Sequence, residues 1–205
     1  MNLSDEIEKC KECVNQKLDG SDRLNTRRKP YFHFDVERKW KPDKVRVLFV
    51  AESPPWDGKQ RYFYNPDVVE KRTNLRKEVL TYLDLNSLKE FRDEGFFLVD
   101  SIKCRLDKTK KKRVPARIIR TCSEQFLHRE IRELKSRKIF VLGDTAKKAL
   151  QTFPDFQKLR EHKVTEGYDK NLSGYYVILS VFPGGQTRQY KNEIERAFAK
   201  IQCAL

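Results

Sequence analysis

Four apolar runs, each followed by apolar residues at helical spacing, most strongly constrain how this chain can fold. The runs cover residues 44–51, 95–104, 138–144 and 174–185. The first run, KVRVLFVA, is almost continuously apolar, which is typical of a strand that helices cover on both faces. Strands that alternate with helices predict a mainly parallel sheet between two helical layers. We therefore expect an α/β fold, a three-layer αβα sandwich around a four-stranded, mainly parallel sheet, in one domain spanning residues 1–205.

The expected helices lie between these runs. They are predicted at residues 1–17, 65–83, 115–137, 145–152 and 188–201, with a loop at 19–43. Ligands of parallel sheets bind beyond the carboxyl ends of the strands. The polar and proline-containing loops that follow the runs fall at this edge, at residues 52–56, 100–105 and 182–185.

The charge of the chain favours a polyanionic partner. Formal net charge is +14, and the basic residues cluster at 23–30, 38–44 and 108–117. Such patches supply the sequence-independent part of nucleic-acid binding, although a solvated basic surface would have the same composition. Aromatic residues lie among the basic ones, which suits base stacking. DNA or RNA is therefore the expected partner.

The chain has no apolar run of about 18 residues, so no transmembrane helix is predicted. Its first residues, MNLSDEIEKCKECVNQ, are acidic and polar, unlike a signal peptide. We therefore expect a cytoplasmic protein without a membrane partner, and a monomer.

Five cysteines occur, at positions 10, 13, 104, 122 and 203. Cys10 and Cys13 form a CxxC in the N-terminal segment 1–43, and Cys104 and Cys122 form a second, wider pair. Two separated pairs suit a four-thiolate site for zinc or an iron–sulfur cluster, while unrelated thiols remain the equal alternative on spacing alone. Cys203 stands apart from both pairs.

Several motifs in order resemble the iron–sulfur-containing (family 4-like) uracil-DNA glycosylases of bacteria and archaea. After the CxxC comes AESPP at 51–55, which matches the Gly-Glu-Ala-Pro-Gly loop of the family. DSIKCR at 100–105 then matches the family's Asn-x-x-Lys-Cys-Arg. A helix that starts at Pro115 and contains Cys122 follows, and then LGDTAKKAL at 142–150 for Leu-Gly-x-Thr-Ala-x-x-Ala-Leu. FPG at 182–184 stands where the family has His-Pro-Ser.

The resemblance spans nearly the whole chain and implies a structural [4Fe–4S] cluster rather than zinc. Its ligands would be Cys10, Cys13, Cys104 and Cys122. In the family, the loop between the last two of these cysteines contacts DNA. Here that loop is the most basic segment of the chain, and the residues expected to bind DNA are Lys110, Lys111, Lys112 and Arg113.

The resemblance also implies which residues act on the glycosidic bond. Glu52 takes the place of the polar residue of the first motif, where a carboxylate positions water or stabilises the sugar cation; the alternative is a loop carboxylate bonded to backbone amides. Ser53 would bind water. Asp57 is a second carboxylate nearby, either a helper or a turn residue.

Base binding is expected to involve an aromatic residue, Phe63, or Tyr64 if the loop is shifted by one; both also suit an ordinary core. Asp100 stands where the family has asparagine. An ionised carboxylate only accepts hydrogen bonds, so it should favour a base edge with an amino group over uracil, unless burial keeps the acid protonated.

Phe182 replaces the family histidine that donates to the base as negative charge develops, and phenylalanine cannot donate. Loss of one such donor costs about 3 kcal/mol in other enzymes. The backbone N–H groups around Gly184 are the expected substitutes. Arg188 would enter the gap that the flipped base leaves, or else contact a phosphate.

We therefore predict a DNA glycosylase that hydrolyses the N-glycosidic bond of a flipped damaged or deaminated base. One alternative is a member of the superfamily that binds nucleic acid without catalysis. The other is an α/β enzyme acting on a different glycosidic or nucleotide substrate, although the chain lacks glycine-rich phosphate loops.

Overall fold

The structure of the protein is a computed structural model, which describes residues 3–27, 29–56, 61–66, 75–109, 113–166, 168–184 and 189–203. Within these residues, one five-stranded sheet forms the centre, in the order β3-β2-β5-β7-β6. Its strands are β2 (Val47–Ala51), β3 (Phe96–Asp100), β5 (Lys138–Leu142), β6 (Asp169–Leu172) and β7 (Tyr175–Ser180). All pairs are parallel except β6–β7. The predicted α/β sandwich is confirmed.

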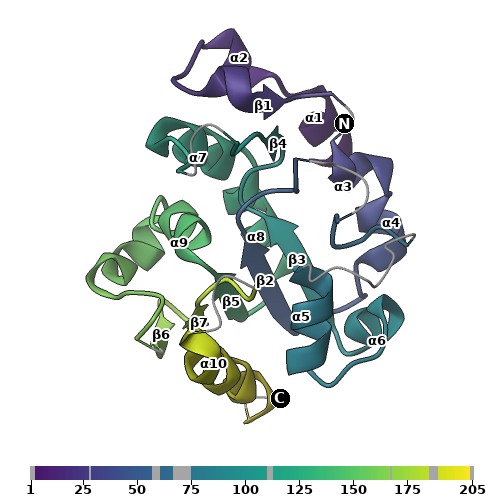
Figure 1. Cartoon of the computed structure of the whole chain (residues 1–205), viewed down its shortest axis with the longest axis vertical. Coiled ribbons are helices and arrows are strands. Elements are labelled where there is room, and N and C mark those ends of the chain that lie inside the picture. The colour runs from purple at the N-terminus through teal and green to yellow at the C-terminus, as the bar shows by residue number, and fades with distance from the viewer. Residues whose placement is uncertain are drawn as a thin grey trace.

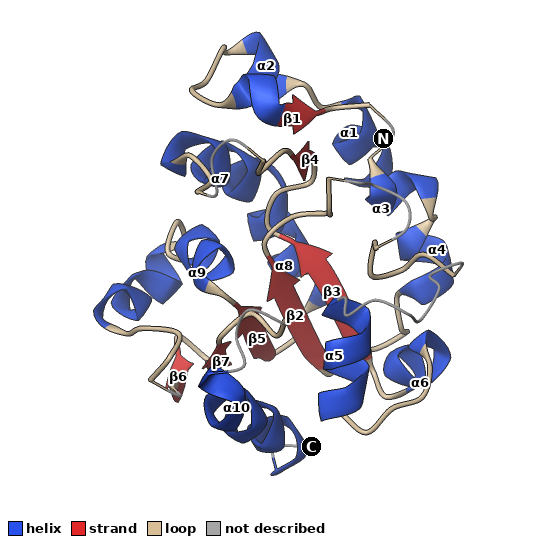
Figure 2. Ribbon diagram, viewed as in Figure 1, coloured by secondary structure: helices blue, strands red, loops and turns tan. Residues whose placement is uncertain are grey.

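Helices cover both faces of the sheet (Figures 1 and 2). The first side carries α5 (Leu75–Tyr82), α6 (Leu88–Asp93) and α10 (Lys191–Cys203). The second side carries α7 (Ala116–Cys122), α8 (His128–Leu134) and α9 (Asp144–Leu150). Smaller helices are α1 (Leu3–Lys9), α2 (Glu12–Asn15), η1 (Ser21–Arg23), α3 (Pro30–His33), α4 (Val36–Trp40) and η3 (Pro154–Glu161). No described helix is long and apolar enough to cross a membrane.

The core is built on the strands that the apolar runs predicted. Every residue of β2 is buried, as is every residue of β3. Phe49 of β2 packs against Phe91 of α6, with ring centroids 5.4 Å apart, and against Phe140 of β5 at 5.2 Å. Phe198 of α10 closes this layer, 4.6 Å from Phe140. Burial of such aromatic side chains contributes roughly 1.5–3 kcal/mol each, so this layer holds the sheet against its first side.

The fifth strand, β6, was not predicted. Its sequence, DKNL, has three polar residues and two exposed ones, because the strand lies at the sheet edge and needs no apolar pattern. It pairs with β7 through a tight turn at Ser173 and Gly174, whose φ angles are 49° and 82°. Positive φ at both central residues is the geometry of the commonest two-residue hairpins.

The expected helix at 115–137 is present, but a π-type turn, η2 (Ser123–Leu127), interrupts it between α7 and α8. Such turns widen a helix locally and are frequent at functional sites. Cys122 is the last residue before the widened turn. The helix therefore changes its pitch next to one of the predicted ligands.

One expectation for the first half of the chain was wrong. The segment 19–43, predicted as a loop, contains η1, α3 and α4 as well as a short strand, β1 (Leu24–Asn25). Of the predicted helix at 65–83, residues 67–74 lie outside the described residues, and α5 is the part that the structure describes. The Asn65 N–H closes a turn by donating to the Tyr62 carbonyl at 3.1 Å.

Strand β1 pairs antiparallel with β4 (Arg105–Leu106), which follows the loop after β3. The pairing places Leu24 opposite Leu106 and Asn25 opposite Arg105. Backbone bonds of this kind tie a segment near the N-terminus to the middle of the chain. The N-terminal CxxC is thereby brought towards Cys104.

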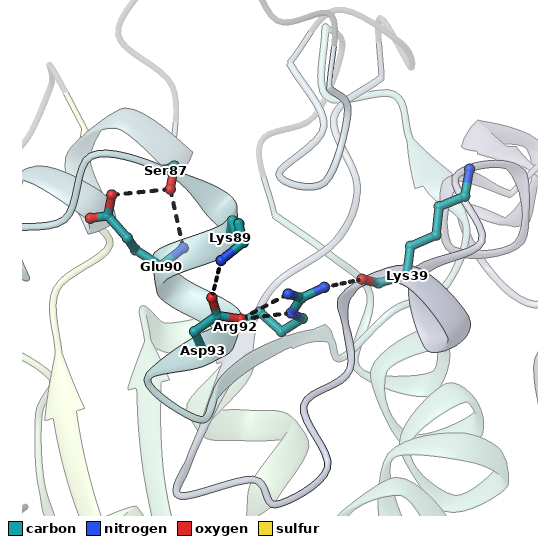
Figure 3. A network of polar contacts seen from close by, with 6 residues as sticks. All are labelled: Lys39, Ser87, Lys89, Glu90, Arg92 and Asp93. Carbon is teal, nitrogen blue, oxygen red and sulfur yellow. Dashed lines mark hydrogen bonds and ion pairs between the residues drawn. The ribbon is translucent and has the colours of Figure 1, made fainter.

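Helix α6 begins at a side-chain cap that the sequence analysis did not identify (Figure 3). The Ser87 hydroxyl accepts from the Glu90 backbone N–H at 3.1 Å. Arg92 donates to the Lys39 carbonyl at 3.4 Å and thus joins α6 to the end of α4. Lys89 and Asp93 form an ion pair of 2.7 Å one turn apart. This network secures the helix that carries Phe91.

Candidate active site and cysteine cluster

A cavity of about 1040 Å³ lies at the carboxyl ends of β2, β3, β5 and β7. This is the edge at which parallel sheets bind their ligands. The cavity is lined by Glu52, Ser53, Pro54, Pro55, Trp56, Arg61, Tyr62, Phe63, Leu75, Leu98, Asp100, Leu106, Asp107, Lys108, Thr109, Leu142, Gly143, Asp144, Thr145, Phe182, Pro183 and Gly184. The loops singled out in the sequence thus meet in one place.

Glu52 follows β2 directly and is held on both carboxylate oxygens. Thr145, in the first turn of α9, donates its hydroxyl to Oε2 at 2.5 Å. Lys108, from the loop after β4, forms an ion pair with Oε1. The backbone carbonyl of Glu52 accepts from the N–H of Ile102 and the hydroxyl of Ser101, both at 2.9 Å. A carboxylate with 19% exposure is therefore fixed in orientation at the cavity wall.

Of the two residues predicted to act with Glu52, the structure describes Ser53 but not Asp57. Ser53 is half-buried and lines the cavity next to Glu52. Asp57 lies outside the described residues. The prolines at positions 54 and 55 and the exposed Trp56 continue the wall towards solvent.

Of the two candidate stacking residues, only Phe63 borders the cavity. It packs edge-on against Phe91 at 5.1 Å and is only 3% exposed. Tyr64 is not among the lining residues. Its hydroxyl donates to the Leu98 carbonyl at 3.1 Å and accepts from the Leu98 N–H at 2.6 Å. Since β3 is an edge strand, Tyr64 satisfies backbone groups that have no partner strand.

Asp100 ends β3 and faces the cavity with 8% exposure. Burial raises the pKa of this carboxyl to about 7, against the lowering effect of Lys103, while Glu130 raises it further. Protonated and ionised forms therefore coexist near neutral pH. Both alternatives predicted for Asp100, the ionised carboxylate and the acid that burial keeps protonated, are thus populated.

Behind Asp100 lies a buried ion pair. Lys103 and Glu130 each have 2% exposed side chains, and Lys103 Nζ donates to Glu130 Oε2 at 2.5 Å. The same ammonium donates to the Asp100 carbonyl at 2.6 Å. Glu130 Oε1 is buried and has no hydrogen-bond partner within the described part of the chain. The position of the Asp100 backbone thus depends on a charged pair inside the protein.

Phe182 and Gly184 follow β7 at the opposite wall. Phe182 is 39% exposed, and its Cβ lies 3.2 Å from where a side chain at Gly143 would begin. Gly143 has φ 87°, so glycine is required there both for its backbone and for this close approach. Gly184 lines the cavity beneath the Phe182 ring. Arg188 lies outside the described residues.

The predicted DNA-binding loop between Cys104 and Cys122 is described except for residues 110–112. Lys110, Lys111 and Lys112 lie outside the described residues, and Arg113 is exposed, with its carbonyl accepting from Arg23 at 3.0 Å. Lys108 was not among the site residues predicted from the sequence. Its place in the basic run 108–117 was the only feature of the sequence that pointed to it. Its contact with Glu52 could not be predicted, because the two residues are far apart in the sequence.

Cys10, Cys13, Cys104 and Cys122 line one second, smaller pocket. All four thiols are free. The Lys103 backbone N–H donates to Cys122 Sγ at 3.3 Å. Burial raises the pKa of Cys104 to about 12; Lys29 opposes this rise, and Cys10 and Cys13 add to it. The shared pocket and the effect of Cys10 and Cys13 on the pKa of Cys104 both show that these thiols lie close together.

Buried positive charge borders this cysteine pocket. Lys29 is only 1% exposed, and its ammonium donates to the carbonyls of Glu8 and Cys10, both at 2.8 Å. A buried cation favours thiolate over thiol. Yet no three His, Cys, Asp or Glu side chains in the described ranges form a group that could hold a metal ion.

A family model described as "Uracil DNA glycosylase superfamily" matches residues 39–205. The match contains Glu52, Asp100, Cys104 and Cys122, whereas Cys10 and Cys13 precede it. No curated protein matches the chain.

Proposed function

Since this chain belongs to the uracil DNA glycosylase superfamily, we propose that it hydrolyses the N-glycosidic bond of a damaged or deaminated base in DNA. The observation that carries the proposal is the cavity in which Glu52 and Asp100, from neighbouring strands, both line the wall with Phe63. A base must leave the stack to reach such a cavity, at a cost of a few kcal/mol. Phe63 is the aromatic residue we assign to stack on the base, because it borders the cavity, although only 3% of it is exposed in the free protein.

Cleavage of the bond leaves positive charge on the sugar and negative charge on the departing base. The fixed carboxylate of Glu52 stabilises the sugar cation and orients a water for attack on C1′. Thr145 restricts Glu52 to one orientation, so no reorganisation is needed during the reaction. Phe182 offers no hydrogen bond to the departing base, and the backbone N–H of Gly184 is the donor we assign in its place.

The choice of base follows from Asp100. As a carboxylate it only accepts, which suits an edge with an amino group, such as that of cytosine. As a carboxylic acid it both accepts and donates, which suits the N3–H and O4 of uracil as an amide would. Because the pKa of Asp100 is about 7, the residue can bind either the amino-bearing edge or the uracil edge near neutral pH.

We expect the ratio of activity on cytosine-type to uracil-type bases to rise with pH through about 7. The ratio changes at most about tenfold per pH unit, as the ratio of the ionised to the protonated form does. The measurement is excision from oligonucleotides with one uracil, cytosine or hypoxanthine, revealed by alkaline cleavage, at several pH values. The same panel tests the proposed activity itself.

Asp100→Asn is the matched variant, because an amide keeps the shape but does not titrate. It should prefer uracil at every pH and lose the pH-dependent ratio. An unchanged base profile in Asp100→Asn would show that Asp100 does not read the base. Binding of modified DNA without excision of any base would instead support a binding module without catalysis, which the phenylalanine at position 182 favours.

We also propose that the four cysteines hold a [4Fe–4S] cluster. A cluster spreads four thiolates over four iron atoms, so the thiols need not meet around one ion as zinc requires. This suits four cysteines that share a pocket without forming a single-ion site. The backbone N–H bonded to Cys122 Sγ and the buried Lys29 suit the negative charge of such a group. When bound, it would serve as a structural link between the N-terminal segment and the loop after β3.

Anaerobically purified protein should contain about four iron atoms per chain and absorb light at about 400 nm. Cys122→Ser should lose most of the iron and the absorbance, because one thiolate ligand is missing. Cys203→Ser is the control and should keep both. About one zinc per chain in a colourless protein would contradict the cluster.

A further inference from the structure

The base-excision reaction does not use the amine of Lys108, although an amine in an active site can act as a nucleophile. Its ammonium group lies in the cavity and pairs with Glu52, the residue assigned to the sugar. Excision leaves an abasic deoxyribose in the same place, and in its ring-opened form this sugar has an aldehyde at C1′. An amine beside an aldehyde forms a Schiff base, which is an established use of lysine in active sites.

We propose that Lys108 is a catalytic nucleophile that forms a Schiff base with C1′ of an abasic site and thereby breaks the DNA strand. The proposal goes beyond base excision and rests on the proposed function only in placing abasic DNA at this cavity. The substrate class is DNA with an abasic deoxyribose, whichever reaction produced it.

The surroundings of Lys108 suit a nucleophilic amine. Burial lowers its pKa, and the positive charge of Arg23 lowers it further. The Glu52 carboxylate opposes this by favouring the ammonium, but the same carboxylate can accept the proton that the ammonium must lose before it attacks. Arg23 is itself buried and held to the Arg113 carbonyl at 3.0 Å. The Lys108 side chain remains 44% exposed, so the amine is accessible from the cavity.

Glu52 supplies the base that the reaction needs. Oε1 pairs with Lys108, while Thr145 holds Oε2 at 2.5 Å, so one carboxylate lies beside the amine in a fixed orientation. A carboxylate in that position can take up a proton released next to the amine. The described lysines Lys29, Lys103 and Lys147 are more deeply buried and bonded to backbone carbonyls.

The reaction balances without any oxidant or reductant. The Lys108 ammonium first gives one proton to Glu52, and the resulting amine adds to C1′. The aldehyde oxygen then leaves as water, with one proton from the nitrogen and the proton returned by Glu52, and a protonated imine remains. Glu52 then accepts a proton from C2′, a double bond forms between C2′ and C3′, and the C3′–O bond breaks. The downstream strand leaves with a 5′-phosphate. Water hydrolyses the imine, which returns the amine and releases an unsaturated aldehyde on the upstream strand.

The test uses the full chain and an oligonucleotide with a preformed abasic site, so it does not depend on base excision. With sodium borohydride, which reduces an imine to a stable amine, we expect a covalent protein–DNA adduct. Peptide mapping should place the adduct on Lys108. Without borohydride, we expect a strand break that needs no alkali.

Lys108→Arg keeps the positive charge but cannot form the imine, so both the adduct and the break should fall to background while abasic DNA still binds. Lys148→Arg is the matched control, because Lys148 is also a lysine paired with a carboxylate, Asp144, at 2.6 Å. It should behave as the unaltered protein does.

An adduct mapped to another residue, no adduct in the unaltered protein, or an unchanged strand break in Lys108→Arg would each overturn the proposal. If a variant is unstable, the position of the adduct in the unaltered protein, found by peptide mapping, still tests the role of Lys108. Absence of base excision with an intact Lys108 adduct would count against the proposed glycosylase alone.

Discussion

Glu52→Gln should lower the rate of base excision by about 100- to 1000-fold, the range seen when one preorganised electrostatic group is removed from an active site. The glutamine keeps the size of the side chain and can still meet Thr145, but it has no charge to stabilise the sugar cation. The loss should therefore appear in kcat rather than in binding. Single-turnover excision, with affinity for the same DNA measured by fluorescence anisotropy, separates these two effects.

Affinity for DNA should stay the same or increase in Glu52→Gln, because Lys108 loses its carboxylate partner and becomes free for phosphate. Glu133→Gln is the control, since it removes the same charge from an ion pair with Arg129 on α8, outside the cavity lining. A rate within a few-fold of the unaltered protein would show that Glu52 is a structural loop carboxylate.

Lys103→Met should lower the free energy of unfolding by about 3–5 kcal/mol, because it leaves Glu130 buried without its cation. The double variant Lys103→Met/Glu130→Leu should recover much of that loss, since a buried apolar pair of similar volume is often nearly neutral. Urea unfolding of the two single variants and the double variant measures the coupling.

The loss in Lys103→Met should depend on pH. Burial already raises the pKa of Glu130, and Lys103 opposes that rise, so removing Lys103 raises the native pKa further. A native pKa above the unfolded value means that the native state binds more protons, so stability is retained at low pH and lost as the pH rises. The variant should therefore be less destabilised at about pH 5 than at about pH 8.

Lys89→Met provides the comparison, because Lys89 and Asp93 form an exposed pair of 2.7 Å (Figure 3). Such pairs contribute about 0–1 kcal/mol. A loss in Lys103→Met as small as that in Lys89→Met would contradict the view that the buried pair supports the end of β3.

Much of the fold followed from apolar periodicity. The four predicted strands are present, because strands buried on both faces must be apolar at nearly every position, as in β2 and β3. Strand β6 was missed because an exposed edge imposes no such pattern. Helix α6 was missed because it is only six residues long, too short for a clear period.

The site was predicted in part for the same reason. Residues that follow parallel strands meet at one edge, so Glu52, Asp100 and Phe182 could be expected in a common cavity. Tyr64 could not be told apart from Phe63, because adjacent aromatic residues look alike in sequence. The structure separates them: the Tyr64 hydroxyl bonds to the backbone of an edge strand, while Phe63 faces the cavity.

The sequence by itself determined the parallel sheet, the edge at which its loops meet and the four cysteines available as ligands, because these depend on residue types and their order. Only the tertiary structure decided the charge state of Asp100 and the partners of Glu52. The pKa of Asp100 depends on how deeply the carboxyl is buried, and the pair of Glu52 with Lys108 depends on two loops that meet in space. Burial and contacts between distant segments exist only once the chain has folded, so no local pattern could record them.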